Sequence, residues 1–78
     1  MSRKEFTDRI HSFFTHPAGL VVKFVGRDAS YVIPFEREDF AVATAQLAEI
    51  WRRQLQARVT VGANLELISV VAIEAAAS

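Results

Sequence analysis

Cysteine is missing from this 78-residue sequence, and glycine and proline are scarce, with three and two residues. The missing cysteine excludes disulfide bonds and thiolate metal sites, and His11 and His16 alone do not make a closed zinc site. The three glycines are isolated, which excludes a glycine-rich phosphate-binding loop. The longest apolar run, residues 70–73, is far shorter than the ~20 residues of a membrane-spanning helix.

An excess of charge of one sign is also lacking, because nine Lys and Arg balance nine Asp and Glu. The balance holds in each half, with six of each sign in residues 1–39 and three of each in residues 40–78. Nucleic-acid-binding proteins usually concentrate positive charge on one face, so no nucleic-acid partner is expected. Charges interrupt the apolar positions of the first 19 residues, so we expect no signal peptide, no membrane partner and a cytoplasmic location.

Hydrophobic residues make up 51% of the sequence and include six Phe, one Trp and one Tyr. This share is at the upper end of the ~45–50% that is usual for soluble domains. A chain of this length forms a single small domain, whose core typically provides only ~3–5 kcal/mol of stability. We therefore expect part of the apolar surface to be buried against a second copy, as in a homodimer, or against another protein.

The N-terminal segment has the pattern of a helix. Residues 2–5, Ser-Arg-Lys-Glu, have the form of a capping box. The apolar residues that follow are spaced by four, three and one positions, as on one helical stripe: Phe6, Ile10, Phe13 and Phe14. Pro17 disfavours helical geometry at the residue before it. The sequence therefore predicts a helix over residues 3–15.

A β-hairpin is predicted next, with strands over residues 20–25 and 30–35. Both segments are rich in β-branched and aromatic residues, and residues 26–29, Gly-Arg-Asp-Ala, have the composition of a turn. Pro34 favours a strand end or a sheet edge, because proline cannot donate a ladder hydrogen bond.

A long helix is predicted over residues 37–56. The acidic cluster Glu36, Glu38 and Asp39 suits the positive end of a helix dipole, and this explains it more simply than a cation site. Apolar residues then recur at three- and four-residue spacing: Phe40, Ala43, Leu47, Ile50, Trp51 and Leu55.

Two interpretations remain open for residues 58–61, which form either a short strand or the end of the helix capped by Gly62. Residues 65–75 then form the last strand. Both of its faces are apolar from residue 67 to residue 73 apart from Ser69, which is typical of a strand that is central or covered on both sides. The predicted fold class is α+β, a two-layer sandwich of order α-β-β-α-β(-β), with helices packed on a mainly antiparallel sheet of three to four strands.

Motifs of enzyme chemistry are missing, so we expect no catalytic residues, no cofactor and no metal site. The expected function is a non-enzymatic protein-interaction or assembly module that self-associates. The alternatives are a small regulatory or inhibitory binder of a larger protein, and a weak nucleic-acid binder. Trp and Arg are enriched at interaction hot spots, and the apolar stripe and last strand supply further contacts. The candidate interface is Phe6, Ile10, Phe13, Phe14, Trp51, Arg52, Arg53, Ile68 and Val70.

Overall fold

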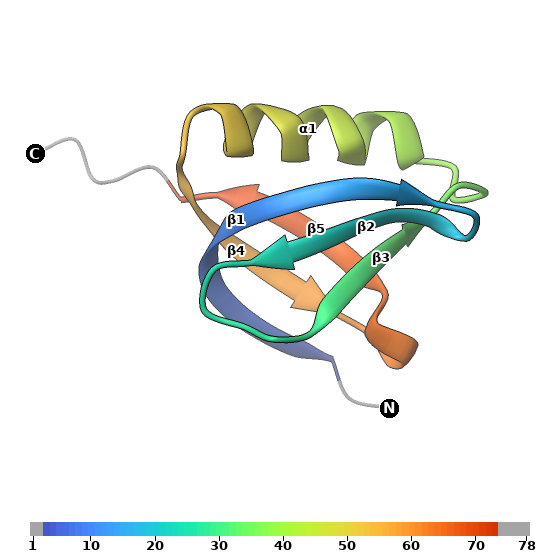
Figure 1. Cartoon of the computed structure of the whole chain (residues 1–78), viewed down its shortest axis with the longest axis horizontal. Coiled ribbons are helices and arrows are strands. Elements are labelled where there is room, and N and C mark those ends of the chain that lie inside the picture. Colours follow the sequence, from blue (N-terminus) through green and yellow to red (C-terminus); the bar gives the residue numbers. More distant parts are fainter. Residues whose placement is uncertain (1–2, 74–78) are drawn as a thin grey trace, which may run out of the picture.

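A five-stranded antiparallel sheet and one helix make up residues 3–73, the part of the chain that the computed structural model describes (Figure 1). In chain order the elements are β1 (Lys4–His16), β2 (Gly19–Phe24), β3 (Ser30–Pro34), α1 (Phe40–Arg52), β4 (Gln56–Val61), a short 3-10 turn η1 (Ala63–Leu65) and β5 (Leu67–Ala72). The predicted α+β class is confirmed. The predicted order and helix count are wrong, because the observed order is β-β-β-α-β-β. The predicted two-layer sandwich with three to four strands is also wrong, because one helix lies on a sheet of five strands.

The sheet order is β3-β2-β1-β4-β5, so the long strand β1 lies at its centre. The first half of β1 pairs with β4 and its second half with β2, both antiparallel. A fourth strand that returns to lie beside the first strand of a meander is a Greek key. The two edge strands approach each other at one parallel bridge, between Val32 and Glu66. The strongly bent sheet therefore forms a partly open barrel, with α1 lying across it (Figure 1).

The predicted helix over residues 3–15 is wrong, because this segment lies in β1. Phe6 and Ile10 both contact the core, as the period-two alternation of a strand allows. A β-bulge then shifts the register between Ile10 and Ser12, so that Phe13 packs on the core opposite Val22. The extra residue changes an even spacing into the odd spacing from 10 to 13, which imitates a helix. Ser2 of the expected capping box lies outside the described residues.

The predicted hairpin has its counterpart in β2 and β3, which pair antiparallel from Gly19↔Pro34 to Lys23↔Ser30. The predicted helix over residues 37–56 is too long at both ends, because α1 begins at Phe40 and ends at Arg52. Its acidic cluster precedes the helix instead of forming the first turn. Gln54, with a φ of 57°, follows the helix end and leads into β4. Within residues 3–73, no helix is long and apolar enough to cross a membrane.

The last two strands decide two further expectations. Residues 58–61 are strand, within β4, and not a helix end. The expected central position of the last strand is wrong, because β5 lies at the edge of the sheet. Val71 on β5 is 59% exposed within the single chain, so cover of the strand by a second subunit stays a prediction. Residues 74 and 75 of the predicted strand lie outside the described residues.

The core lies inside the barrel and includes Leu47 and Ile50 on the inner face of α1. These side chains pack with the buried residues of the strands, and the helix lies against β5 and β1. The buried set is Ile10, Leu20, Val22, Phe24, Tyr31, Ile33, Leu47, Ile50, Ala57, Val59, Val61, Leu67 and Val70.

Gly19 provides a test of this packing, because β2 and β3 approach each other closely there. Its φ is 156°, and an added Cβ would lie 2.2 Å from the carbonyl oxygen of Ile33. Since that oxygen belongs to the backbone of a paired strand, we expect Gly19→Ala to lower the free energy of unfolding by about 2 kcal/mol or more in urea titrations. Gly26→Ala is the control, because its Cβ would meet only the Asp8 carboxylate, at 3.0 Å. Equal losses in the two variants would contradict this packing.

Candidate interaction site at the edge of β5

One arginine covers the first half of the β5 edge. The Arg37 guanidinium donates to the carbonyl oxygen of Ile68 at 3.0 Å and to that of Leu67. The same group pairs with both carboxylate oxygens of Asp39, at 2.8 and 2.9 Å, and with Glu66 at 3.4 Å. Arg37 therefore fastens the loop after β3 to the start of β5, where the barrel would otherwise be open.

The ion pair between Arg37 and Asp39 changes the titration of both groups. The hydrogen bond from the guanidinium, with the attraction between the two charges, lowers the pKa of the Asp39 carboxyl below its ordinary value. The same hydrogen bond raises the pKa of Arg37. We call this set of contacts between Arg37, Asp39 and the start of β5 the Arg37 clamp. Because Arg37 stays charged at every relevant pH, Asp39 is the group whose protonation weakens the clamp.

The second half of the β5 edge has no such cover. In an antiparallel pair, hydrogen-bonded residues alternate, and Ile73 donates to Gln56 at 2.9 Å on the β4 side. Residues 71 and 69 therefore also bond toward β4, and the main-chain groups of Val70 and Ala72 point the other way. Among residues 3–73 no hydrogen bond engages these outward N–H and C=O groups.

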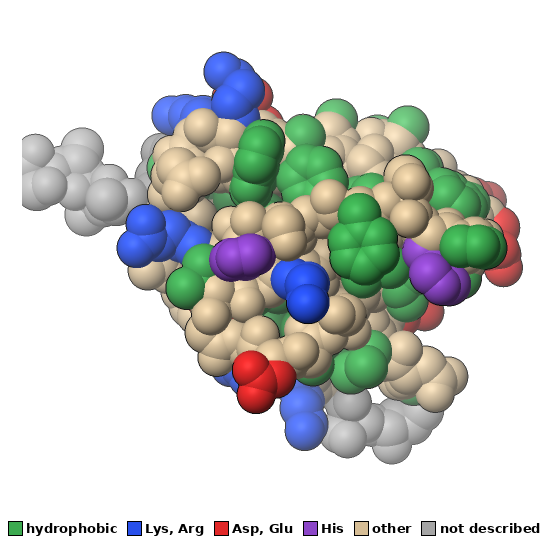
Figure 2. Space-filling view, viewed as in Figure 1, with side chains coloured by type: hydrophobic (Ala, Val, Ile, Leu, Met, Phe, Trp, Pro, Cys, Tyr) green, Lys and Arg blue, Asp and Glu red, His purple; other side chains and the backbone are tan. Residues whose placement is uncertain are grey.

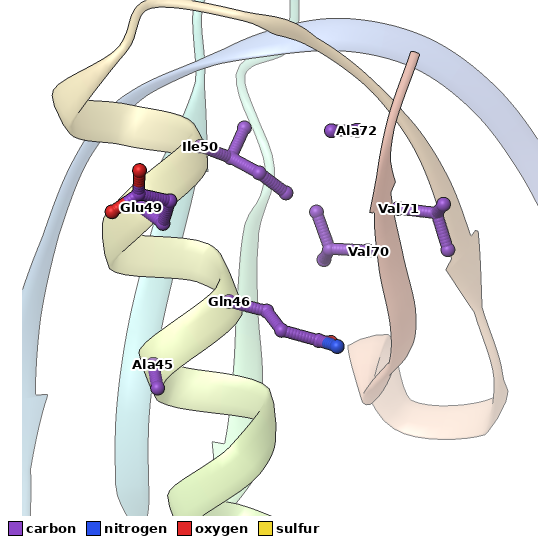
Figure 3. Close-up of a pocket in the computed structure, with 7 residues that line it drawn as sticks. All are labelled: Ala45, Gln46, Glu49, Ile50, Val70, Val71 and Ala72. Atoms are coloured by element: carbon purple, nitrogen blue, oxygen red, sulfur yellow. The ribbon is translucent and has the colours of Figure 1, made fainter. Parts of the chain in front are cut away.

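An apolar groove of about 380 Å³ runs beside this free edge (Figure 3). The helix side is formed by Ala45, Gln46, Glu49 and Ile50, and the strand side by Val70, Val71 and Ala72. Figure 3 shows Gln46 and Val70 pointing toward each other across the groove, whereas Val71 points away from it. A strand that pairs with the β5 edge would therefore contact apolar side chains of the groove on one of its faces.

The predicted interface residues do not form one surface. Ile10 and Val70 are buried in the core, and Ile68 is half-buried at the bulge of β5. Phe6 is half-buried and packs with Phe24 and Tyr31.

The predicted residues around the helix end are only partly brought together. Phe13 packs edge-on against Trp51, at 5.3 Å between ring centroids, and Trp51 remains 40% exposed. Arg52 and Arg53 are exposed beside Trp51 at the end of α1, where Arg52 pairs with Glu49.

Phe14 lies in a different place, on the outer face of the meander formed by β1, β2 and β3. There it is in register with Val21 and Val32. Phe14 is 51% exposed and Lys23 is a neighbouring cation on this face. In Figure 2 the hydrophobic side chains on the viewed side are interspersed with backbone, other side chains and both histidines. One aromatic and one lysine do not make the basic groove with several stacking rings that single-stranded nucleic acids need.

Comparisons of the chain with protein-family models, curated proteins and solved structures found no match. The geometry of the β5 edge is therefore the basis for assigning a function. Arg37 and Val71, which decide that geometry, were not among the predicted interface residues. The uncharged composition of residues 67–72 is the signal that could have indicated Val71, once β5 was placed at an edge.

We expect Arg37→Ala to lower the free energy of unfolding by about 2–3 kcal/mol, because it removes charge-assisted hydrogen bonds to two carbonyls and two carboxylates. Arg37→Lys should recover only part of this, since an ammonium lacks the planar fork of donors. Urea titrations give the comparison. Arg53→Ala, at an exposed arginine, is the control and should change the value by less than about 0.5 kcal/mol. A loss for Arg37→Ala no larger than the control's would contradict the clamp.

The clamp also predicts an acid sensitivity. Since the folded pKa of Asp39 is lowered, its contribution is present above the ordinary pKa of an aspartate and is lost as the pH falls through the folded value. Between about pH 5 and pH 2 the unfolding free energy of the wild type should therefore fall more steeply than that of Asp39→Asn. In an Arg37→Ala background the same substitution should no longer alter the slope. Parallel pH profiles for wild type and Asp39→Asn would refute the coupling.

Proposed function

We propose that this chain is a non-enzymatic interaction module that self-associates through the free edge of β5. A cytoplasmic location belongs to the same proposal. The observation that carries it is the unprotected second half of an edge strand, residues 70–72, whose outward main-chain groups lack partners within residues 3–73.

Edge strands of soluble proteins are normally protected by charged residues, proline, a bulge or a covering segment. β5 has the sequence Leu-Ile-Ser-Val-Val-Ala, without charge or proline. Its bulge at Ile68 and its cover by Arg37 both lie in the first half. The second half therefore has the properties of a strand that another strand completes.

A second β5 in antiparallel orientation fits this edge. A two-fold axis through Val71 places Val70 of one copy opposite Ala72 of the other, and the reverse. The outward groups of both residues then face a partner, so each of the two pairs makes two main-chain hydrogen bonds. The register is thus self-complementary, as an isologous interface requires.

Val71 explains why the partner is a second copy. Its side chain is 59% exposed, and the two-fold axis places it beside the same side chain of the other copy. Valine is well suited to such cross-strand contact. The groove side of the edge adds little charge that would select a different partner, because its one carboxylate, Glu49, is already paired with Arg52.

We expect Val71→Lys to shift the proposed wild-type dimer to a monomer, with association weakened by about tenfold or more, because two like charges would face each other at the axis. The fold should be retained, since this side chain lies on the outer surface. Light scattering over a wide concentration range measures the mass, and circular dichroism measures the fold. Val70→Lys is unsuitable, because Val70 is buried and its replacement would unfold the chain.

Val25→Lys is the matched control, because Val25 is 63% exposed but lies outside the β5 edge. This variant should remain a dimer. A wild type that is monomeric at all concentrations, or a Val71→Lys variant that remains a dimer, would refute self-association by this edge. If the wild type is a monomer, the β5 edge could instead pair with an extended segment of a larger protein, as the alternative of a small regulatory binder requires.

A further inference from the structure

The end of the barrel away from α1 contains a second cavity, of about 490 Å³. Three segments surround it: the start of β1, the loop between β2 and β3, and the turn between β4 and β5. In Figure 1 these segments meet below the sheet, on the side opposite the helix. A cavity of this volume is in the range of small-molecule sites, which runs from about 300 to 1,000 Å³.

The floor of the cavity is aromatic. Phe6 packs edge-on against Phe24 at 5.3 Å between ring centroids, and Tyr31 lies 5.7 Å from both rings. Phe6 and Tyr31 line the cavity directly, together with the apolar side chains of Val61 and Leu65. A flat apolar body could therefore rest on rings that are already held in place.

Tyr31 supplies an unused polar group. Its side chain is more than nine-tenths buried, with 7% exposure, and its ring belongs to the core. Its hydroxyl makes no hydrogen bond within residues 3–73, yet it is not sealed from solvent. Since Tyr31 lines the cavity, this accessible hydroxyl can donate a hydrogen bond to a ligand there.

Arg27 supplies a fixed positive charge. Its guanidinium carbon lies 3.8 Å from the centre of the Phe6 ring, which is a cation–π contact. Arg27 belongs to none of the three ion pairs within residues 3–73. A stacked guanidinium keeps the N–H donors at its edge available for an anion. Lys4 and Glu5 also line the cavity, so its formal charge sums to one positive charge.

The turn at the rim of the cavity is strained. Asn64 and Leu65 have φ values of 57° and 61°, in the left-handed region. This is tolerable for asparagine but unusual for leucine, and such conformations collect at binding sites. The Leu65 side chain, which is 48% exposed, lines the cavity at this turn.

We infer that this cavity binds a small, flat organic monoanion. Its apolar body lies against Tyr31, Val61 and Leu65, its anionic group accepts hydrogen bonds from Arg27, and an acceptor atom accepts a hydrogen bond from the Tyr31 hydroxyl. One net positive charge in the lining favours a single negative charge over two. This site is independent of the proposed pairing of β5, which uses residues 70–72 at the other end of that strand.

The test is a titration of the full ¹⁵N-labelled chain with naphthalene-2-carboxylate, followed by amide chemical shifts. We expect saturable binding with a dissociation constant of about 1 mM or less, and shifts confined to residues 4–6, 27–31 and 61–65. 2-Naphthalenemethanol has the same body without the charge, and it should bind about tenfold more weakly or worse.

Two variants separate the proposed contacts, and Arg58→Gln is the control because Arg58 is an exposed arginine outside the cavity. Tyr31→Phe should weaken binding about threefold or more, and Arg27→Gln about tenfold or more, whereas the control should bind like the wild type. The inference would be overturned by chemical shifts that are scattered or never saturate. It would also be overturned by equal affinity for the neutral analogue, or by unchanged affinity in both cavity variants.

Discussion

The closure of this barrel depends on one guanidinium. The edge strands β3 and β5 share only the bridge between Val32 and Glu66, and beyond it the seam has no ladder. Arg37 replaces the missing strand contacts with hydrogen bonds to two β5 carbonyls, while Asp39 and Glu66 balance its charge. A planar group with five donors can serve both backbone and carboxylates at once, which no other side chain can do.

The same clamp divides β5 into two parts with different properties. The part that Arg37 touches has its outward carbonyls engaged and its bulge in place. The part that follows presents free main-chain groups beside an apolar groove. The start of β5 is thus protected by Arg37, whereas the main-chain edge of residues 70–72 at its end is exposed. The proposed pairing concerns only this exposed part.

The sequence predicted the α+β class, because the hairpin and the central part of α1 have clear local patterns. It failed at β1, where the bulge after Ile10 imitates helical spacing, and a bulge depends on partner strands that are distant in the chain. It also allowed a central position for β5, because an apolar edge strand and a strand inside a sheet can have the same composition. The role of Arg37 could not be predicted, since the two carbonyls of β5 that it binds lie about thirty positions away in the chain.

The division of β1 between two partners also affects how the domain assembles. Its second half meets β2 across a tight turn, with Thr15 opposite Leu20, so this pairing closes only a very short loop. Its first half meets β4, with Lys4 opposite Val61, and this contact must bring together segments from nearly the two ends of the described chain. Loop-closure entropy makes the distant pairing slower and more costly than the local one. The meander is therefore the natural nucleus for folding, and closure of the barrel follows it.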